Sequence, residues 1–213
     1  YEEFGAIEDD PDGSNMEEGY FLPHHAVRRE ESDTHKVRVV LNASHGRGNK
    51  KSLNDCLETG DNLLPHVTSL LIRFRAGKMP LTGDLQKAFF TISVAAEDRK
   101  YLRLIWESPK RMARVPFGAC CSPYLLNATI IHHLKKGVKE GWIEEEFYRK
   151  LRNSLYVDDI VVALNTEEER ETFKTVAIEV FAKAGMTAHK WSDGEKESSV
   201  LGLRWSQNSD TLS

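Results

Sequence analysis

Two adjacent aspartates, Asp158 and Asp159, lie in the middle of the strongest strand signal in the chain, SLYVDDIVVAL at 154–164. The residues around them are apolar and mostly β-branched or aromatic, a composition typical of strands. Asp tolerates turn backbones and two residues suffice for a hairpin loop, so a solvated hairpin tip explains the position of the pair. It does not explain two charges, because Gly is the preferred second residue of such a turn. The pair gains meaning only if another carboxylate lies close to it.

Asp84 is that second acidic position, in LTGDLQKAFF at 81–90. It ends an apolar strand, where a single Asp is more often a cap than a ligand. Two strands, one ending in Asp and one turning at Asp-Asp, bring three carboxylates to one sheet edge, and these repel one another unless cations lie between them. Mg²⁺ prefers carboxylates together with phosphate and water oxygens, and two such ions suit an in-line phosphoryl displacement. The three aspartates therefore predict phosphoryl-transfer chemistry.

The other patterns predict an α+β fold with an antiparallel sheet and helices on one face. Apolar residues recur at helical spacing in LLPHVTSLLIRFRAG from Asn62 onward, Ser122-Pro123 is typical of an N-cap followed by a helix, and Thr166-x-x-Glu169 is a capping box. Expected strands lie in YFLPHHAV, KVRVVLN, MPLTGD, YLRLIW and SVLGLRW. The irregular alternation of helices and strands argues against a doubly wound sheet.

Length and composition limit the class of protein. The 213 residues suffice for one large domain or two small ones, and no run of about 18 apolar residues predicts a membrane span. The first residues, YEEFGAIEDD, do not resemble a signal peptide, and the lack of a starting Met predicts a piece of a longer protein. Cys56, Cys120 and Cys121 are odd in number and two are adjacent, so we expect an intracellular protein without a disulfide framework.

Charge is distributed unevenly along the chain. The net charge is −4, but eight of the 33 acidic residues and no Lys or Arg lie within 1–18, which we interpret as a mobile or loosely packed acidic lead-in. The remainder is therefore net basic, with clusters such as RGNKK at 47–51, RFRAGK at 73–78 and KRMAR at 110–114. Such clusters are usually solvated faces, and here they are dense enough to permit a phosphate-binding surface.

An ordered set of motifs resembles reverse transcriptases: Asp84 in LTGDLQKAFF, VPFGACCSP at 115–123, YVDD at 156–159 and LGLRW at 201–205. More narrowly, GYFLPHHAV, KVRVVLNAS, SLNDCL and the ending WSQNSDTLS resemble the BEL/Pao group of LTR retrotransposons. The resemblance covers nearly the whole chain. YxDD alone is weakly specific, whereas the ordered set is highly specific.

The resemblance implies a role for each matching residue in RNA- and DNA-templated DNA synthesis. Asp84 and Asp158 would be shared ligands of two Mg²⁺ ions, with Mn²⁺ as a substitute, and Asp159 would complete the acidic site. The carbonyl of Leu85 would add an oxygen ligand. Phe89 matches the aromatic residue that lies under the incoming sugar and rejects a 2′-hydroxyl, although from sequence alone a core aromatic is favoured there.

Four further residues are implied to contact the nucleotide. Arg38 matches the arginine that grips the triphosphate, with Arg29 and Lys36 as further candidates. Phe117 falls where retroviral enzymes usually carry Gln and would contact the sugar by packing. Separately, Lys190 is a candidate for the lysine that protonates the leaving pyrophosphate, with a solvated surface Lys as the equally weighted alternative.

The same resemblance implies how the chain is divided and what surrounds it. Residues 19–80 would be mainly fingers, 81–100 palm with the first catalytic Asp, 101–121 the fingers/palm junction, and 122–213 palm with the YVDD hairpin and the primer-grip strand. The thumb and RNase H would lie outside this piece, in a Pol polyprotein with protease and integrase. Expected partners are an RNA or DNA template with its primer and deoxynucleotides, not a membrane. The expected location is the cytoplasm or a virus-like particle, with access to the nucleus.

Two alternatives stay open on sequence grounds. The first is a captured or catalytically inactive retroelement domain that serves as a nucleic-acid-binding module. The second is a Mg²⁺-dependent nuclease or phosphatase, whose site would need a His or Glu beside the aspartates. His132 and His133 are the nearest candidates, and both look like part of a helix. Activity on a primed template with deoxynucleotides separates all three.

Overall fold

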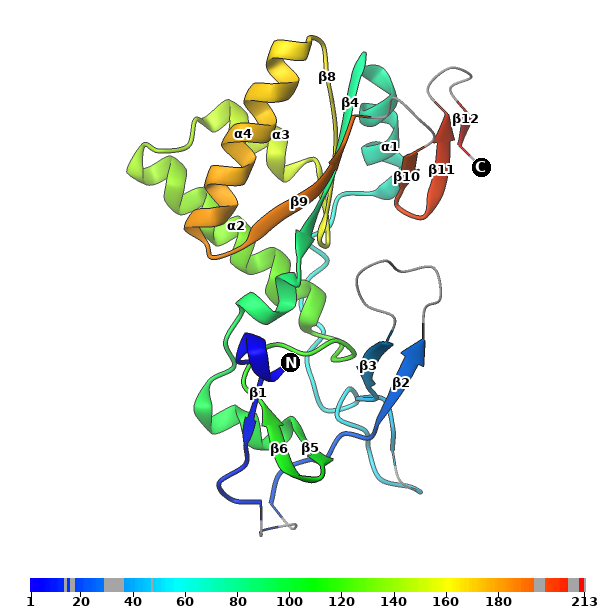
Figure 1. The fold of residues 1–213 in the computed structure, drawn as a ribbon, viewed down its shortest axis with the longest axis vertical. Coiled ribbons are helices and arrows are strands. Elements are labelled where there is room, and N and C mark those ends of the chain that lie inside the picture. Colours follow the sequence, from blue (N-terminus) through cyan, green and yellow to red (C-terminus); the bar gives the residue numbers. More distant parts are fainter. Residues whose placement is uncertain are drawn as a thin grey trace. The chain divides into compact units, whose positions relative to one another are not determined.

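The chain forms two compact units in a computed structural model that describes residues 1–13, 15, 18–28, 37–46, 48–193, 198–206 and 211–212 (Figure 1). The first unit comprises Tyr1–Asp61 and Phe89–Leu126, and the second comprises Asn62–Ala88 and Asn127–Ser213. The helix within 67–76 belongs to the same unit as Asp84, and residues 89–100 belong to the first unit, while the assignment of segments to fingers and palm stays a prediction. No described helix is both long enough and apolar enough to cross a membrane.

The first unit is built on small antiparallel sheets. β1 (Ile7–Asp9), β6 (Ser108–Met112) and β5 (Arg103–Trp106) form one sheet in that order, and β2 (His24–Arg28) pairs with β3 (Val37–Leu41). The 3₁₀ turns are η1 (Glu2–Phe4), η2 (Ala88–Thr91) and η3 (Ala96–Tyr101), of which η2 begins at the last residue of the second unit. The core is a cluster of buried apolar side chains that includes Leu22, Leu41, Leu104 and Met112.

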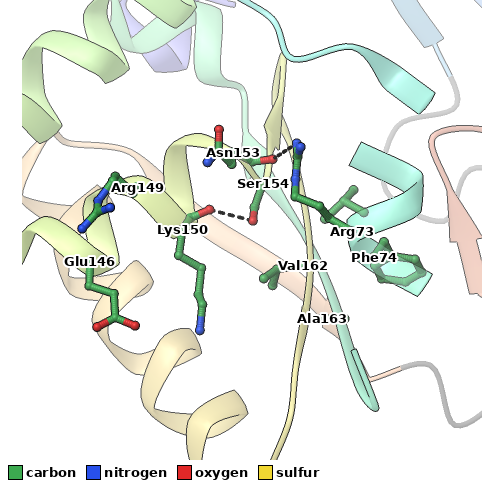
Figure 2. Close-up of a pocket in the computed structure, with 10 residues that line it drawn as sticks. Arg73, Phe74, Glu146, Arg149, Lys150, Asn153, Ser154, Val162 and Ala163 are labelled. Atoms are coloured by element: carbon green, nitrogen blue, oxygen red, sulfur yellow. Dashed lines mark hydrogen bonds between the residues drawn. The ribbon is translucent and has the colours of Figure 1, made fainter. Parts of the chain in front are cut away.

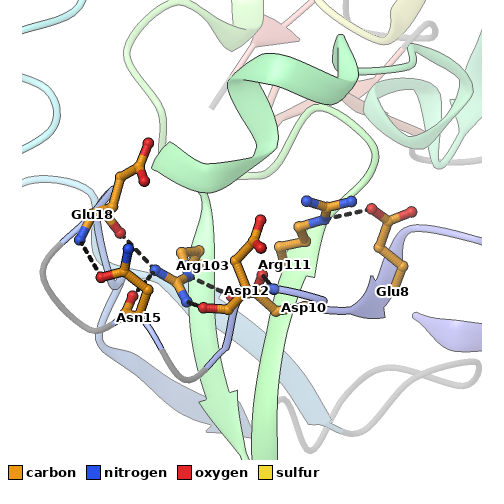
Figure 3. A network of polar contacts seen from close by, with 7 residues as sticks. All are labelled: Glu8, Asp10, Asp12, Asn15, Glu18, Arg103 and Arg111. Carbon is orange, nitrogen blue, oxygen red and sulfur yellow. Dashed lines mark hydrogen bonds and ion pairs between the residues drawn. The ribbon is translucent and has the colours of Figure 1, made fainter.

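The acidic first segment is packed, so the expectation of a loose lead-in is wrong for its described residues. β1 pairs with β6, placing Ile7 opposite Met112. Arg103, 1% exposed, pairs through Nε with Asp10 and donates to the backbone carbonyls of Asp12, Asn15 and Glu18 at 2.6–2.8 Å (Figure 3). A buried guanidinium is stable only with such complete partners.

The basic cluster at 110–114 is also satisfied internally, which corrects its interpretation as a phosphate surface. Arg111 Nε donates to Glu8 at 2.6 Å, and Lys110 Nζ lies 2.8 Å from Asp9. Burial opposes ionisation of Glu8, but hydrogen bonds from Arg111 and Arg99 lower its pKa. Lys110 and Arg111 therefore neutralise the first segment instead of facing a polyanion.

The second unit is a four-stranded antiparallel sheet in the order β7 (Leu155–Tyr156), β8 (Asp159–Leu164), β4 (Met79–Gln86) and β9 (Thr187–Ser192). Figure 1 shows α2 (Ser122–Glu140), α3 (Glu145–Arg152) and α4 (Glu167–Lys183) on one side of this sheet, and α1 (Val67–Ala76) on the other. A second small sheet comprises β10 (Ser198–Val200), β11 (Leu203–Ser206) and β12 (Thr211–Leu212), and the turn at Leu201-Gly202 joins β10 to β11. Val200 packs with Leu70 and Phe74 of α1 against Val161.

The expected α+β class with an antiparallel sheet and most of the expected elements are confirmed, but α1 packs on the other face of the sheet, so the helices do not all lie on one face. The helix starts also differ. Thr166 Oγ1 accepts from the Glu169 N–H at 3.1 Å, as a capping box requires. Ser122 is instead the first residue of α2, and its hydroxyl donates to the Pro116 carbonyl at 2.7 Å. The first apolar helix starts only at Val67, after Pro65, whose ring disfavours helical backbone at the preceding residue. The elements α3, β6 and β9 were not anticipated.

Candidate active site

Asp84 and Asp159 face each other across two paired strands. They are register partners in the β4–β8 pair. The next pair along, Leu85 and Asp158, is hydrogen-bonded, with the Leu85 N–H donating to the Asp158 carbonyl at 2.8 Å. In an antiparallel ladder hydrogen-bonded and non-hydrogen-bonded pairs alternate, and side chains approach closest in the latter. Asp84 and Asp159 form such a close pair, so the fold brings their carboxylates together.

The alternation of the strands places both carboxylates on the face opposite to helices α2 and α4. Leu81, Leu85 and Ile160 are buried on the helix side, at 0–2% exposure. Asp84 and Asp159 alternate with them and are half-buried. Neighbouring residues of a strand point to opposite faces, so the apolar pattern of these strands fixes the direction of the two acids.

The three aspartates act on one another electrostatically. Burial, followed by the negative charges of Asp158 and Asp84, raises the pKa of Asp159 to about 6. Like charges placed together in a partly dry site favour a neutral partner or a bound cation. Asp158 and Asp84 thus lie near enough to Asp159 to affect its charge, and the role of the three residues as metal ligands stays a prediction.

The hairpin turn that carries Asp158 has strained backbone. Val157 has a φ of 57°, in the left-handed region, between the end of β7 at Tyr156 and Asp158. A β-branched residue in this region is a genuine outlier and costs on the order of 1–3 kcal/mol. The strain accompanies a tight turn that presents Asp158 next to the strand end.

His189 is a member of this site that the sequence patterns did not reveal. Its Nε2 lies 2.7 Å from Asp84 Oδ1, and the two residues are register partners in the β4–β9 pair. The signal that could have found it is the alternation of buried Ala188 with polar neighbours in GMTAHKW, which marks a strand. Asp84 thus lies between Asp159 on one neighbouring strand and His189 on the other.

Lys190 lies in a β-bulge next to His189. The β4–β9 register passes from Asp84↔His189 to Thr82↔Ser192, so β9 has one extra residue there, and Lys190 has a φ of 50°. Bulges redirect side chains and are common next to active sites. Lys190 is exposed, which is compatible with a proton donor to a departing group and with a solvated Lys.

Gly83 makes room for a large ring on the strand that carries Asp84. A Cβ at Gly83 would lie 2.8 Å from the Trp191 ring, so any side chain here would displace the indole. Within the described part of the chain, the buried Trp191 Nε1 has no hydrogen-bond partner.

The donor set suits an oxygen-seeking cation, although the side chains as they lie do not form a metal site. Three carboxylates and a backbone carbonyl are the ligand types that Mg²⁺ prefers. The Leu85 N–H points toward the hairpin that carries Asp158. The carbonyl of a strand residue points to the same side as its N–H, so the Leu85 carbonyl also points toward this hairpin. Among the residues that the structure describes, no three His, Cys, Asp or Glu side chains are grouped closely enough to hold a metal.

The residues expected to contact a nucleotide belong to the first unit. Phe89 is 7% exposed, and its ring meets Phe117 edge to face at 4.9 Å between centroids. Phe117 is 40% exposed. The burial of Phe89 shows a packing role, and its contact with a sugar stays a prediction. The backbone of Arg38 is in β3, its side chain is not described, and Arg29 and Lys36 lie outside the described residues.

His132 and His133 do not accompany the aspartates. The Nε2 of His133 is hydrogen-bonded to the Val180 carbonyl of α4 at 2.8 Å, and its ring contacts Trp142. His132 is exposed on α2. The histidine beside Asp84 is His189 instead, which corrects the choice of candidates.

Solved structures of known proteins share this fold. The foamy viral protease-reverse transcriptase dRH in complex with double-stranded DNA is 20% identical, with a TM-score of 0.70 over 99% of this chain and 33% of that one. The foamy viral enzyme in complex with an RNA/DNA hybrid is 20% identical, with a TM-score of 0.66 over 95% and 24%. The native prototype foamy virus enzyme is 19% identical, with a TM-score of 0.68 over 93% and 23%.

These likenesses establish the fold, and the chain spans only about a quarter to a third of the chains just named. No curated protein sequence matches it. Family membership comes from the sequence itself, because the family model described as reverse transcriptase (RNA-dependent DNA polymerase) matches residues 30–204. That match spans most of the chain, including Asp84, the YVDD hairpin and β9, and the chain therefore belongs to the reverse transcriptase family.

Proposed function

We propose that this chain catalyses RNA- and DNA-templated DNA synthesis, in which a primer 3′-hydroxyl attacks a deoxynucleoside triphosphate and pyrophosphate leaves. The observation that carries the proposal is the close pair of Asp84 and Asp159 with Asp158 at the adjacent turn, in a chain of this family.

The three aspartates would hold two Mg²⁺ ions, with the Leu85 carbonyl as a further ligand and Mn²⁺ as a substitute. When bound, such ions neutralise the charge that develops on the attacking and leaving oxygens. The sheet supplies rigidity, since Asp84 and Asp159 are fixed by paired strands whose other face is buried against helices. His189 donates to Asp84 and orients its carboxylate. Lys190, in the bulge, would give a proton to the leaving pyrophosphate.

Residues of the first unit would select the nucleotide. We assign discrimination against the 2′-hydroxyl to Phe89, with Phe117 packed against it, and triphosphate contacts to Arg38 with Arg29 and Lys36. The wider setting is also part of the proposal: a BEL/Pao-type element, supported by FLPHHAV and SLNDCL, whose Pol polyprotein supplies protease, RNase H and integrase. Its place of action would be the cytoplasm or a virus-like particle, with access to the nucleus.

Primer extension tests this proposal. Wild-type chain, given a primed RNA or DNA template, deoxynucleotides and Mg²⁺, should extend the primer. Asp84→Asn and Asp158→Asn should lower incorporation by at least about a thousandfold, because each removes a charged ligand of the reacting centre. Asp193→Asn, which changes an acid near the end of β9, is the control and should leave the rate near wild type. Wild-type rates in the Asp84 variant would refute the assignment, and template binding without extension by any form would favour the inactive binding module.

One observation favours a second candidate, Mg²⁺-dependent hydrolysis of a phosphodiester. A water nucleophile needs a general base, and the His189–Asp84 contact places a histidine at the acidic cluster. The extension assay run without deoxynucleotides discriminates the two. Shortening of the primer or template that is lost in His189→Ala would support hydrolysis.

A further inference from the structure

A cavity of about 510 Å³ lies in the second unit, away from Asp84, between α1, α3 and β8. Figure 2 shows Arg73 and Phe74 of α1 on one side of β8, and Glu146, Arg149 and Lys150 of α3 on the other. The volume is in the range of ligand-binding pockets. Its lining includes Val161, Val162 and Ala163, three successive residues of β8. Successive side chains point to opposite faces, so a cavity that contacts all three lies along the edge of the strand.

That edge carries backbone groups without a strand partner. The Val161 N–H donates to the Ser154 carbonyl at 2.7 Å on the β7 side, and the Leu164 carbonyl accepts from the Lys78 N–H at 3.0 Å on the β4 side. Because strand residues alternate in direction, Ala163 turns its N–H and its carbonyl to the β7 side. β7 pairs only with Asp159 and Ile160, and no other strand in the described ranges pairs with β8 on that side. The edge at Ala163 is therefore open.

The charge around the open edge is mainly positive. Three cations, Arg73, Arg149 and Lys150, line the cavity against one carboxylate, Glu146. Arg73 is already engaged, because its Nη2 donates to the Asn153 carbonyl at 2.9 Å. Arg149 lies 4.0 Å from exposed Glu145, and no described carboxylate is within ion-pair distance of Lys150. Phe74 is buried in the core, so the groove offers an incoming chain two cations, Arg149 and Lys150, beside the open edge.

We propose that this groove binds an extended acidic segment of a partner polypeptide, which adds a strand to β8 at Ala163. An added strand uses both the N–H and the carbonyl of Ala163, whereas a phosphate would use only cations and N–H groups. In an extended segment with an acidic residue at every second position, the acidic face would meet Arg149 and Lys150. The proposal does not depend on polymerase activity.

The probe is a short synthetic peptide in which Glu and Val alternate, tested on the full 213-residue protein. Fluorescence polarisation measures binding, and the hydrogen-exchange rate of the Ala163 amide, followed by NMR, reports strand pairing. We expect the peptide to bind and to slow exchange at Ala163 by about tenfold or more at saturation. A Lys/Val peptide should not bind. A Glu/Val peptide N-methylated on the residues facing β8 should lose most of its affinity, since it lacks the donors.

Two variants separate the groove from general charge. Lys150→Glu should weaken Glu/Val binding by about tenfold or more, because a charge-assisted contact becomes a repulsion. Lys135→Glu makes the same charge change on an exposed residue of α2 and should alter binding by less than about twofold. Absence of binding, binding with unchanged Ala163 exchange, or equal losses in both variants would each overturn the proposal. The proposal would also be overturned if a single-stranded oligonucleotide bound the groove, lost this binding in Lys150→Glu, and was not displaced by the peptide.

Discussion

His189 donates a hydrogen bond to Asp84 across the β4–β9 pair, with 2.7 Å between Nε2 and Oδ1. An ionised carboxylate has no hydrogen to give, so the ring nitrogen is the donor. The contact fixes one oxygen of Asp84 while Asp159 lies on the other neighbouring strand.

Removing this donor should impair catalysis without unfolding the protein. We expect His189→Ala to lower single-nucleotide incorporation by about 10–100-fold and to raise the Mg²⁺ concentration needed for half-maximal rate, because an unfixed carboxylate binds the cation less well. His189→Gln keeps an N–H donor and should recover most of the rate. His132→Ala, on exposed α2, is the control. Equal rates in His189→Ala and wild type across a Mg²⁺ titration would make the contact purely structural.

The acidic cluster should make the metal-free protein less stable at neutral pH. Asp159 has a folded pKa of about 6, above its ordinary value of 3.8, so the stability associated with it is complete below about pH 4 and is lost as pH rises through 6. At pH 7.5 Asp159→Asn should therefore raise Tm by about 2–4 °C, for a gain on the order of 1 kcal/mol after solvent screening. The difference from wild type should disappear near pH 4. Thermal melts with a chelator present, at both pH values, check this, and a difference independent of pH would contradict it.

Because the hairpin backbone is strained, Gly at position 157 should give a more stable protein than Ala, the reverse of their usual order in strands. Because Val157 has a φ of 57°, Val157→Gly relieves the backbone, whereas Val157→Ala removes the same branched side chain but keeps a Cβ in the left-handed region. We expect the Gly variant to be more stable than the Ala variant by about 1 kcal/mol, although Gly in strands is ordinarily the less stable of the two. Urea unfolding measures the order. A more stable Ala variant than Gly variant would show that the backbone of the turn relaxes out of the left-handed region.

Phe89 should affect both folding and sugar selection. The ring is 7% exposed and packs on Phe117, so Phe89→Val should lower Tm. If the ring also excludes a 2′-hydroxyl, the ratio of ribonucleotide to deoxynucleotide incorporation should rise by on the order of tenfold or more. Phe90→Val, a neighbouring ring that also contacts Phe117, is the matched control. A lower Tm with an unchanged ratio would leave Phe89 with packing alone.

The parts of the site that sequence could predict are those with local signals. The YVDD turn, the strand that ends near Asp84 and the Thr166 capping box each depend on neighbouring residues. His189 contacts Asp84 from 105 residues away, and pairing at that distance has no local pattern. The sequence of α3, EEFYRKLR, has few apolar residues, and only Leu151 is fully buried, so it carries no clear helical pattern. The packing of residues 1–13 likewise depends on partners far along the chain. Composition alone therefore predicted a loosely packed segment.

The burial of Arg103 against the first segment has a consequence for the timing of biosynthesis. Asp10 precedes its partner by 93 residues, so at about 5–20 residues per second the segment leaves the ribosome roughly 5–20 s before β5 exists to receive it. During that interval β1 has neither its strand partner nor its buried arginine. Eight acidic residues within 1–18 keep the waiting segment hydrated and discourage it from associating with other nascent chains. The charge that later neutralises Arg103, Lys110 and Arg111 thus first protects the polypeptide while it is still incomplete.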